Sequence, residues 1–203
     1  MKKYAVLHEP GDIVTLAGTR FVVLDVERRG SLPDSLFLLA LESVGASEFG
    51  SSNNYAESDL KKAVDKWLED MGKRGLDNVK LIPREIDLTT LDGSGCYGKL
   101  SVKAAPLTLD EAREYADIIP NAERWCWLAT GWSGPSKSDG DLALCVGSNG
   151  DWNGNSCSSS LGIRPALKAP SILFEDSEAG LDLSKIPTDD LLQEIHRRLA
   201  EKA

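Results

Sequence analysis

Apolar runs separated by turn residues in the first part of the chain predict a β-hairpin followed by a third strand. Residues 11–26 are rich in β-branched side chains and are interrupted at Gly18, as in two short strands joined by a tight turn. Residues 35–41 form the next apolar run and predict a buried strand. A shorter strand is predicted at 79–82, and the turn residues of 87–99 predict a loop.

An amphipathic helix is predicted from residue 59 to residue 71. Its apolar residues recur at steps of three and four and therefore share one face of the helix. They are Leu60, Ala63, Val64, Trp67, Leu68 and Met71. Ser58 has the position and the side chain of an N-cap, and Gly72 or Gly75 is suited to end the helix. Trp67 is therefore predicted to be a core residue.

A second helix is predicted to begin after Thr108 and to end before Pro120. Thr108 and Glu111 have the spacing of a capping box, in which each side chain accepts a hydrogen bond from the other residue's backbone. This helix is expected to turn Tyr115, Ala116 and Ile119 toward the core.

The end of the chain is predicted to extend past the domain. Residues 171–174 predict a last strand, and the acidic residues 175–183 predict a linker. Thr188 then caps a predicted helix with an apolar stripe formed by Leu191, Leu192, Ile195 and Leu199. We divide the chain into a domain of residues 1–175 and a tail of residues 176–203, whose helix packs on the domain or serves in oligomerisation or docking.

The central segment 124–168 combines large aromatic residues with small polar ones. Four of the five tryptophans lie here, among Gly, Ser, Asn and Asp residues that favour turns and exposed hydrogen bonds. Neither a plain helix nor a plain hydrophobic core has this composition. The segment predicts short strands that carry a recognition surface.

The composition narrows the classes of partner. At 203 residues the chain is long enough for one good-sized core. Its net charge of -9 and pI near 4.8 disfavour nucleic acid and anionic membrane surfaces, which attract clustered Lys and Arg. No apolar run has the length of a signal peptide or a membrane span, so we expect the protein to be made and folded in a cytoplasm.

The cysteines and histidines do not predict an enzyme. Cys96, Cys126, Cys145 and Cys157 form no CxxC pair, so free thiols are expected. The only histidines, His8 and His196, lie near the two chain ends, away from the central segment, which disfavours Ser-His and Cys-His mechanisms.

No metal or cofactor is predicted either. Residues 149–154 resemble the start of a calcium loop, but Asn149 replaces the first Asp, and Ser160 stands where a bidentate Glu is needed. Only Asp139, Asp141 and Asp151 could supply carboxylates there. Residues 147–150 lack the Lys-Ser/Thr of a phosphate loop and predict a hairpin turn instead.

Two motifs of the central segment carry a family resemblance. The string Trp125-Cys126-Trp127-Leu128, followed by a polar stretch and then by Gly162-Ile163-Arg164-Pro165-Ala166-Leu167, resembles bacterial and phage C-type-lectin-like domains. That family is related in fold to the formylglycine-generating enzymes, and within it the chain is most similar to the variable proteins of diversity-generating retroelements. The opening hairpin and leucine-rich strand fit the same family, so the resemblance covers about residues 11–174.

The resemblance implies an α+β C-type lectin-like fold, with short mixed or antiparallel strands, two helices and here a helical tail. It also implies a variable binding segment at about 129–160. The predicted ligand-binding residues are Ala129, Gly131, Trp132, Ser133, Ser136, Ser148, Asp151, Trp152, Asn153, Asn155, Cys157, Ser158 and Ser159. The predicted scaffold residues are Trp125, Trp127, Gly162, Arg164 and Pro165; Trp125 and Trp127 are expected to face one side of a strand, and Arg164 to tie a loop through carboxylate or carbonyl contacts.

The implied function is non-enzymatic binding of an unknown protein or cell-surface ligand, with a phage or prophage source and a place on the phage particle. In that family mutagenesis is directed at adenines, so Asn codons can become Ser, Asp, Gly, Cys or Tyr codons, as the composition of residues 148–160 suggests. Because the chain continues past Lys168 to residue 203, a fixed lectin-like adhesin or tail protein remains the alternative. A third hypothesis is an oxidase related to formylglycine-generating enzyme that uses Cys145 or Cys157. The oligomeric state is left open.

Overall fold

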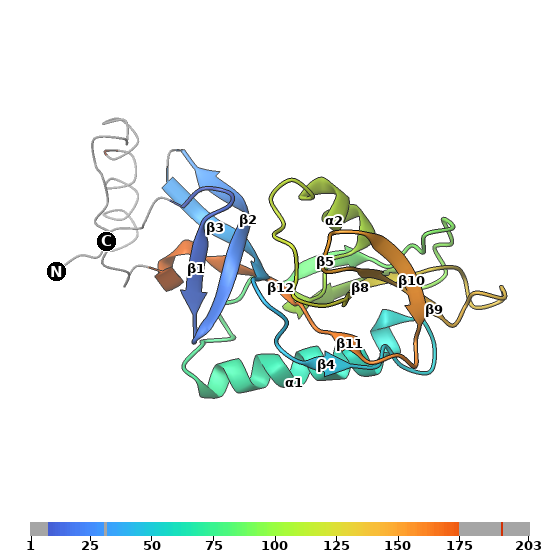
Figure 1. Ribbon diagram of the computed structural model, residues 1–203. Helices are drawn as coiled ribbons and strands as arrows, with labels where there is room; N and C mark the ends of the chain where they lie inside the picture. The colour runs from blue at the N-terminus through green and yellow to red at the C-terminus, as the bar shows by residue number, and fades with distance from the viewer. Residues whose placement is uncertain (1–7, 31, 175–191, 193–203) are drawn as a thin grey trace.

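The computed structural model describes residues 8–30, 32–174 and Leu192. Within these residues the chain has an α+β architecture, with two five-stranded sheets, one two-stranded sheet and two α-helices (Figure 1). The predicted mixture of short strands and two helices is confirmed. The predicted acidic linker and the helix capped by Thr188 lie outside the described residues, apart from Leu192.

The first sheet is built on the opening hairpin. Its strand order is β1-β2-β3-β12-β7, with the bounds β1 Ile13–Leu16, β2 Thr19–Arg29, β3 Leu32–Ala40, β12 Ala166–Pro170 and β7 Ala104–Ala105. The turn between β1 and β2 has φ of 47° at Ala17 and 76° at Gly18, and two such residues twist a hairpin in the sense that its strands require. The hairpin and the third strand were predicted and are confirmed.

The second sheet comes mainly from the central segment. Its strand order is β10-β9-β8-β11-β4, with the bounds β10 Trp152–Ser156, β9 Leu142–Val146, β8 Cys126–Gly131, β11 Leu161–Gly162 and β4 Ala46–Ser47. The remaining strands, β5 Arg84–Asp87 and β6 Lys99–Val102, pair with each other on either side of the predicted loop. The predicted turn at 147–150 joins β9 to β10.

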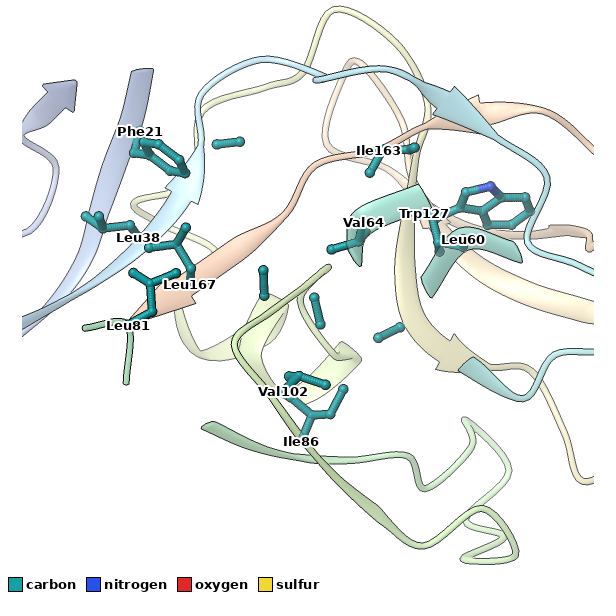
Figure 2. Packing of buried hydrophobic residues seen from close by; sticks show 14 of the residues in the cluster. Phe21, Leu38, Leu60, Val64, Leu81, Ile86, Val102, Trp127, Ile163 and Leu167 are labelled. Carbon is teal, nitrogen blue, oxygen red and sulfur yellow. The ribbon is translucent and has the colours of Figure 1, made fainter. Parts of the chain in front are cut away.

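Helix α1, Asp59–Lys73, follows the short 3-10 helix η1, Tyr55–Glu57, and runs along one side of both sheets (Figure 1). Ser58 is its N-cap and accepts a hydrogen bond from the backbone N–H of Lys61, as predicted. Leu60 and Val64 point from this helix into the core beside Trp127 (Figure 2). Trp67 is half-buried and packs against the same cluster, which confirms its predicted place.

Helix α2, Leu109–Glu114, covers the opposite side of the second sheet and begins with the predicted capping box between Thr108 and Glu111. It ends earlier than predicted, because the chain continues in turns after Tyr115. Ala116 is exposed, so its predicted place in the core is wrong, whereas Tyr115 and Ile119 pack partly against the core.

Two hydrophobic clusters cover opposite faces of the sheets. The first lies on the α1 side and includes Phe21, Leu38, Trp127 and Leu167 (Figure 2). The second lies on the α2 side. It includes Leu39 and Leu128, which follow Leu38 and Trp127 in the sequence. Successive residues of a strand point to opposite faces, so the central strands are buried on both sides. Strand β8 is buried along its whole length.

Two short strands, predicted at residues 79–82 and 171–174, do not form. Val79 lies in a turn and is 84% exposed, and only Ile82 of residues 79–82 makes an isolated bridge, to Lys168. Residues Ser171–Phe174 form the 3-10 helix η2 instead of a strand. The strand comes just before them, as β12, because Leu167 and Ala169 fill the first core cluster while β12 pairs with β3. Short apolar runs carry no periodicity that separates these outcomes.

The buried His8 predicts a pH-dependent stability. Its ring meets Phe174 edge-on at a centroid distance of 5.8 Å, and its buried Nε2 has no hydrogen-bond partner. Burial lowers the pKa of His8 below its ordinary value of 6.5, with a smaller opposing effect from Asp12. The unfolded chain therefore takes up a proton at a higher pH than the folded one, so stability is present above pH 6.5 and falls as the pH is lowered through the folded pKa.

We expect the wild type to lose more unfolding free energy than His8→Phe between about pH 7.5 and about pH 5.5, by at most about 1.4 kcal/mol per pH unit. Urea unfolding of both proteins at the two pH values measures the difference. Equal losses would show that His8 does not titrate differently in the two states.

Candidate functional site

Strand β10 is a polar, solvent-facing strand on a buried support. It forms one edge of the second sheet (Figure 1), and its five residues are Trp152, Asn153, Gly154, Asn155 and Ser156. Its neighbour β9 is buried at its three central residues, and the next strand, β8, is buried throughout. A rigid apolar pair of strands therefore holds a row of polar side chains at the surface.

The register of β10 on β9 sorts these side chains between two faces. Trp152 lies opposite Val146 and Gly154 opposite Leu144, on the α2 side, while Asn153 and Asn155 lie opposite Cys145 and Ala143. Trp152 is 38% exposed, and the guanidinium of Arg113 from α2 lies 5.7 Å from the centroid of its ring. An exposed Trp beside an Arg offers a large contact area next to a positive charge.

The asparagines also protect the open edge of β10. The Oδ1 of Asn153 accepts a hydrogen bond of 2.8 Å from the backbone N–H of Gly154, and the Oδ1 of Asn155 accepts one of 2.9 Å from that of Ser156. An edge strand otherwise presents unpaired N–H groups to solvent.

Tryptophans pack on two glycines of this hairpin. A Cβ atom added at Gly154 would lie 2.5 Å from the ring of Trp132, and one at Gly147 would lie 3.0 Å from the ring of Trp125. Only glycine leaves room for an aromatic ring at this distance from the backbone. Trp132 is consequently half-buried and packs against the second core cluster, so it acts as a support for β10.

Loops lie at both ends of β10. At one end the turn 147–151 exposes Ser148, Asn149 and Asp151, and Gly150 takes its positive φ of 86°. At the other end the loop 133–141 exposes Ser136 and enters β9 at Leu142, which pairs with Ser156. Ser158, just after β10, is exposed too.

A buried asparagine that sequence reasoning missed anchors the loop 133–141. The amide of Asn53 donates hydrogen bonds of 2.9 Å to the carbonyl of Ser133 and of 3.0 Å to that of Leu142. Its Oδ1 accepts a hydrogen bond of 2.6 Å from the hydroxyl of Tyr97. Asn53 lies 80 residues before Ser133, so no local pattern signals this contact.

Several predicted ligand-binding residues are buried and do not reach the surface. Ala129 and Gly131 belong to β8, which is covered on both faces, and Cys157 packs into the first core cluster. Ser133, the first residue of the loop that Asn53 anchors, is buried as well. Direct contact of these four with a ligand was a wrong expectation, because each is already covered by protein. Trp132 and Ser159 are half-buried.

The remaining predicted residues lie on one hairpin and its adjoining loops, and all of them are exposed except Asn155 of β10, which is half-buried. We call them the recognition surface: Ser136, Ser148, Asp151, Trp152, Asn153, Asn155 and Ser158.

The predicted scaffold residues are buried with one exception. Trp127, Gly162, Arg164 and Pro165 are buried, and Arg164 donates to the carbonyls of Ala40 and Pro120, as predicted for a residue that ties a loop. Trp125 is 36% exposed and lies just before β8, so it is not a residue of that strand and is not buried as Trp127 is. It supports the turn by packing on Gly147.

The three buried cysteines are poor sources of the reactive thiolate form. All four are free, and burial raises the pKa of Cys126, that of Cys145 to about 11 and that of Cys157 to about 12. These three thiols are therefore protonated near neutral pH, whereas the thiolate is the reactive form. Within the described ranges, His, Cys, Asp and Glu form no group of three or more that could hold a metal ion. None of the described helices is both long and apolar enough to cross a membrane.

Comparison with known proteins finds no matching protein family, no matching curated protein and no matching solved structure.

Proposed function

We propose that this chain is a non-enzymatic binding protein whose recognition surface is diversified by a retroelement on a C-type lectin-like scaffold. The observation that carries the proposal is β10, a polar edge strand that is exposed at Trp152 and Asn153 and half-buried beyond them, supported by β9, which is buried at its centre, and by β8, which is buried throughout. Function of this kind needs side chains that can change without disturbing the fold. Substitutions at exposed positions away from special contacts usually alter stability by less than about 0.5 kcal/mol.

The chemistry of the recognition surface suits binding. Trp152 supplies a rigid aromatic contact, and the amides and hydroxyls around it supply hydrogen bonds that adapt to different partners. The raised pKa values of the buried Cys145 and Cys157 disfavour the oxidase alternative. The alternative of a fixed lectin-like adhesin or tail protein uses the same surface without variation.

Two features support the C-type lectin-like assignment. The opening hairpin lies in one sheet with β12, which follows the Gly-Ile-Arg-Pro string, so the two ends of the domain meet. The segment between the two family motifs forms most of a second sheet, on which the polar residues gather at the edge. This arrangement separates a constant scaffold from a surface that can vary.

Sequencing of this locus across its source population tests the proposal. We expect substitutions to concentrate at the recognition surface, and an adenine-rich near-copy of codons 125–167 to lie beside the gene. Buried positions within the same segment, Ala129, Gly131, Cys157 and the glycines that seat the tryptophans, should stay constant. Substitutions spread evenly over buried and exposed positions, or none at all, would contradict diversification.

Binding is tested with two of the natural variants so recovered. On protein and glycan arrays we expect them to bind different targets, and exchange of residues 153 and 158 between them to exchange the preference. Exchange of exposed residues of α1, such as Lys62 and Glu69, is the control and should leave the preference unchanged. A preference that follows the α1 residues would overturn the assignment of the surface.

A further inference from the structure

A small apolar cavity lies between α2 and the second sheet, behind β10. Its volume is about 120 Å³, and its walls include Leu107, Ala112, Ile119, Leu128, Val146 and Trp152. Ala116, Asn121 and Trp152 are exposed as well as lining it, so the cavity reaches the surface between them. This volume is below that of an apolar cavity of about 150 Å³ that binds benzene in another protein, so a ligand of this cavity must be compact and can extend through its opening.

One charged side chain forms part of this wall. Arg164 is 6% exposed, its Nε donates to the carbonyl of Ala40 at 2.8 Å, and its Nη1 donates to that of Pro120 at 2.9 Å. Its buried Nη2 has no hydrogen-bond partner. None of the ion pairs within the part of the chain that the structure describes includes Arg164.

The positive charge of Arg164 is therefore buried without a counterion. An arginine stays protonated in proteins, and burying an ion without a partner of opposite charge costs several kcal/mol. Two neutral carbonyls satisfy two of its donors but do not neutralise it. A bound anion would supply both the missing acceptor and the missing charge.

We propose that the cavity binds a small monocarboxylate carried on an apolar group. The carboxylate accepts a hydrogen bond from Nη2 of Arg164, and the apolar group packs between Ile119, Leu128 and Trp152. The apolar lining disfavours phosphate or sulfate, which need several donors on every side. This site is separate from the recognition surface, with which it shares only Trp152.

Benzoate and hexanoate are suitable probes, with benzamide and hexanamide as uncharged counterparts of the same shape. In isothermal titration calorimetry of the full chain, we expect each carboxylate to bind at least about tenfold more tightly than its amide. Equal affinity of acid and amide, or no binding of either acid, would overturn the proposal.

The location is tested at Ala116, because this exposed residue lines the cavity and is not in the core. Ala116→Leu should fill the entrance and weaken carboxylate binding by at least about tenfold with little change in stability. Ala46→Leu, at an exposed alanine of β4 outside the cavity, is the matched control and should bind as the wild type does. Unchanged binding by Ala116→Leu would place the carboxylate elsewhere and refute the site.

Arg164→Gln removes the charge, and we expect this variant to bind each carboxylate and its amide with equal affinity. Arg164 also donates hydrogen bonds to two backbone carbonyls, so this variant can fail to fold. The comparison of Ala116→Leu with Ala46→Leu then decides the outcome. Asn153→Asp, on the recognition surface, should leave benzoate binding unchanged. The outcome of these titrations is thus independent of whether the recognition surface varies.

Discussion

Replacing Trp127 by alanine is expected to lower the free energy of unfolding by about 3 to 5 kcal/mol. The side chain is 1% exposed and belongs to the first core cluster. Its ring meets Phe49 edge-on at a centroid distance of 5.4 Å, and its Nε1 donates a hydrogen bond of 2.9 Å to the carbonyl of Ser47 in β4. Alanine would leave a cavity between β8, β4 and α1 and would remove that hydrogen bond.

Two further tryptophan variants separate the causes. Trp127→Phe keeps most of the buried ring but removes the N–H donor, and should cost about 1 to 3 kcal/mol. Trp125→Ala, two residues earlier, should cost much less because Trp125 is 36% exposed. Urea unfolding followed by circular dichroism compares the three without relying on tryptophan fluorescence. Similar costs at positions 125 and 127 would contradict the distinct environments of the two rings.

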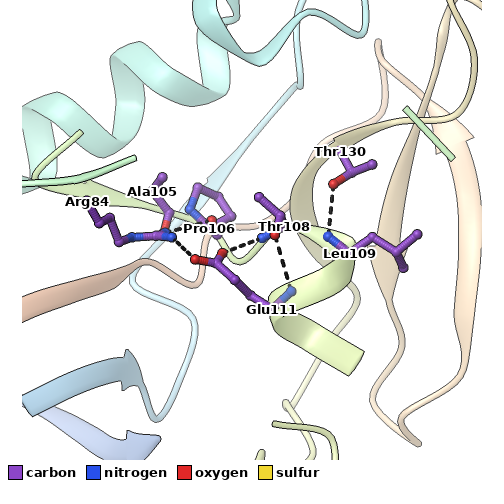
Figure 3. Close-up of polar contacts among 7 residues, drawn as sticks. All are labelled: Arg84, Ala105, Pro106, Thr108, Leu109, Glu111 and Thr130. Atoms are coloured by element: carbon purple, nitrogen blue, oxygen red, sulfur yellow. Dashed lines mark hydrogen bonds and ion pairs between the residues drawn. The ribbon is translucent and has the colours of Figure 1, made fainter. Parts of the chain in front are cut away.

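Replacing Arg84 by methionine is the second change with a large expected effect, a loss of about 3 to 5 kcal/mol. The Arg84 side chain is 8% exposed, pairs with Glu111 and donates to the carbonyls of Ala105 at 2.9 Å and Pro106 at 3.1 Å (Figure 3). Its guanidinium carbon also lies 5.3 Å from the centroid of Phe37. Methionine fills much of the space but leaves Glu111 without its cation and the two carbonyls without their donor.

The partner variants test whether the charge pair is the cause. Glu111→Gln retains an oxygen for the capping box with Thr108, so it should cost less than Arg84→Met. Arg84→Lys keeps the charge but not the planar fork that serves three acceptors, and should fall between wild type and Arg84→Met. In a double-mutant cycle of Arg84→Met and Glu111→Gln, a coupling near zero would show that the two side chains act independently.

The parts of the fold that were predicted from sequence depend on local signals. The turn at Gly18 and the caps at Ser58 and Thr108 involve residues that are neighbours in the chain, so their spacing is visible in the sequence. The polar character of β10 and its turn was visible for the same reason. Composition therefore located the hairpin that carries the candidate site.

The residues that sequence reasoning misplaced depend on contacts between distant parts of the chain. Ala129 and Cys157 are small residues with polar neighbours in the sequence. They are core residues because the assembled fold places both in the first hydrophobic cluster. Trp125 and Trp127 are two residues apart, a spacing that predicts the same side of a strand. Because β8 is covered on both faces, this spacing does not tell which of the two rings is buried. The anchoring of a loop by Asn53 likewise requires the assembled fold.

If the surface is diversified as proposed, the asparagines of β10 would limit the repertoire that it can display. Each holds the N–H of the following residue with its own side-chain oxygen. A residue without a short acceptor at position 153 or 155 would uncover that N–H, and an uncovered strand edge invites pairing with another molecule and aggregation. Asn, Asp and Ser keep an acceptor in reach, whereas longer or apolar residues do not. Solubility, as well as affinity, would thus select which members of a diversified population persist.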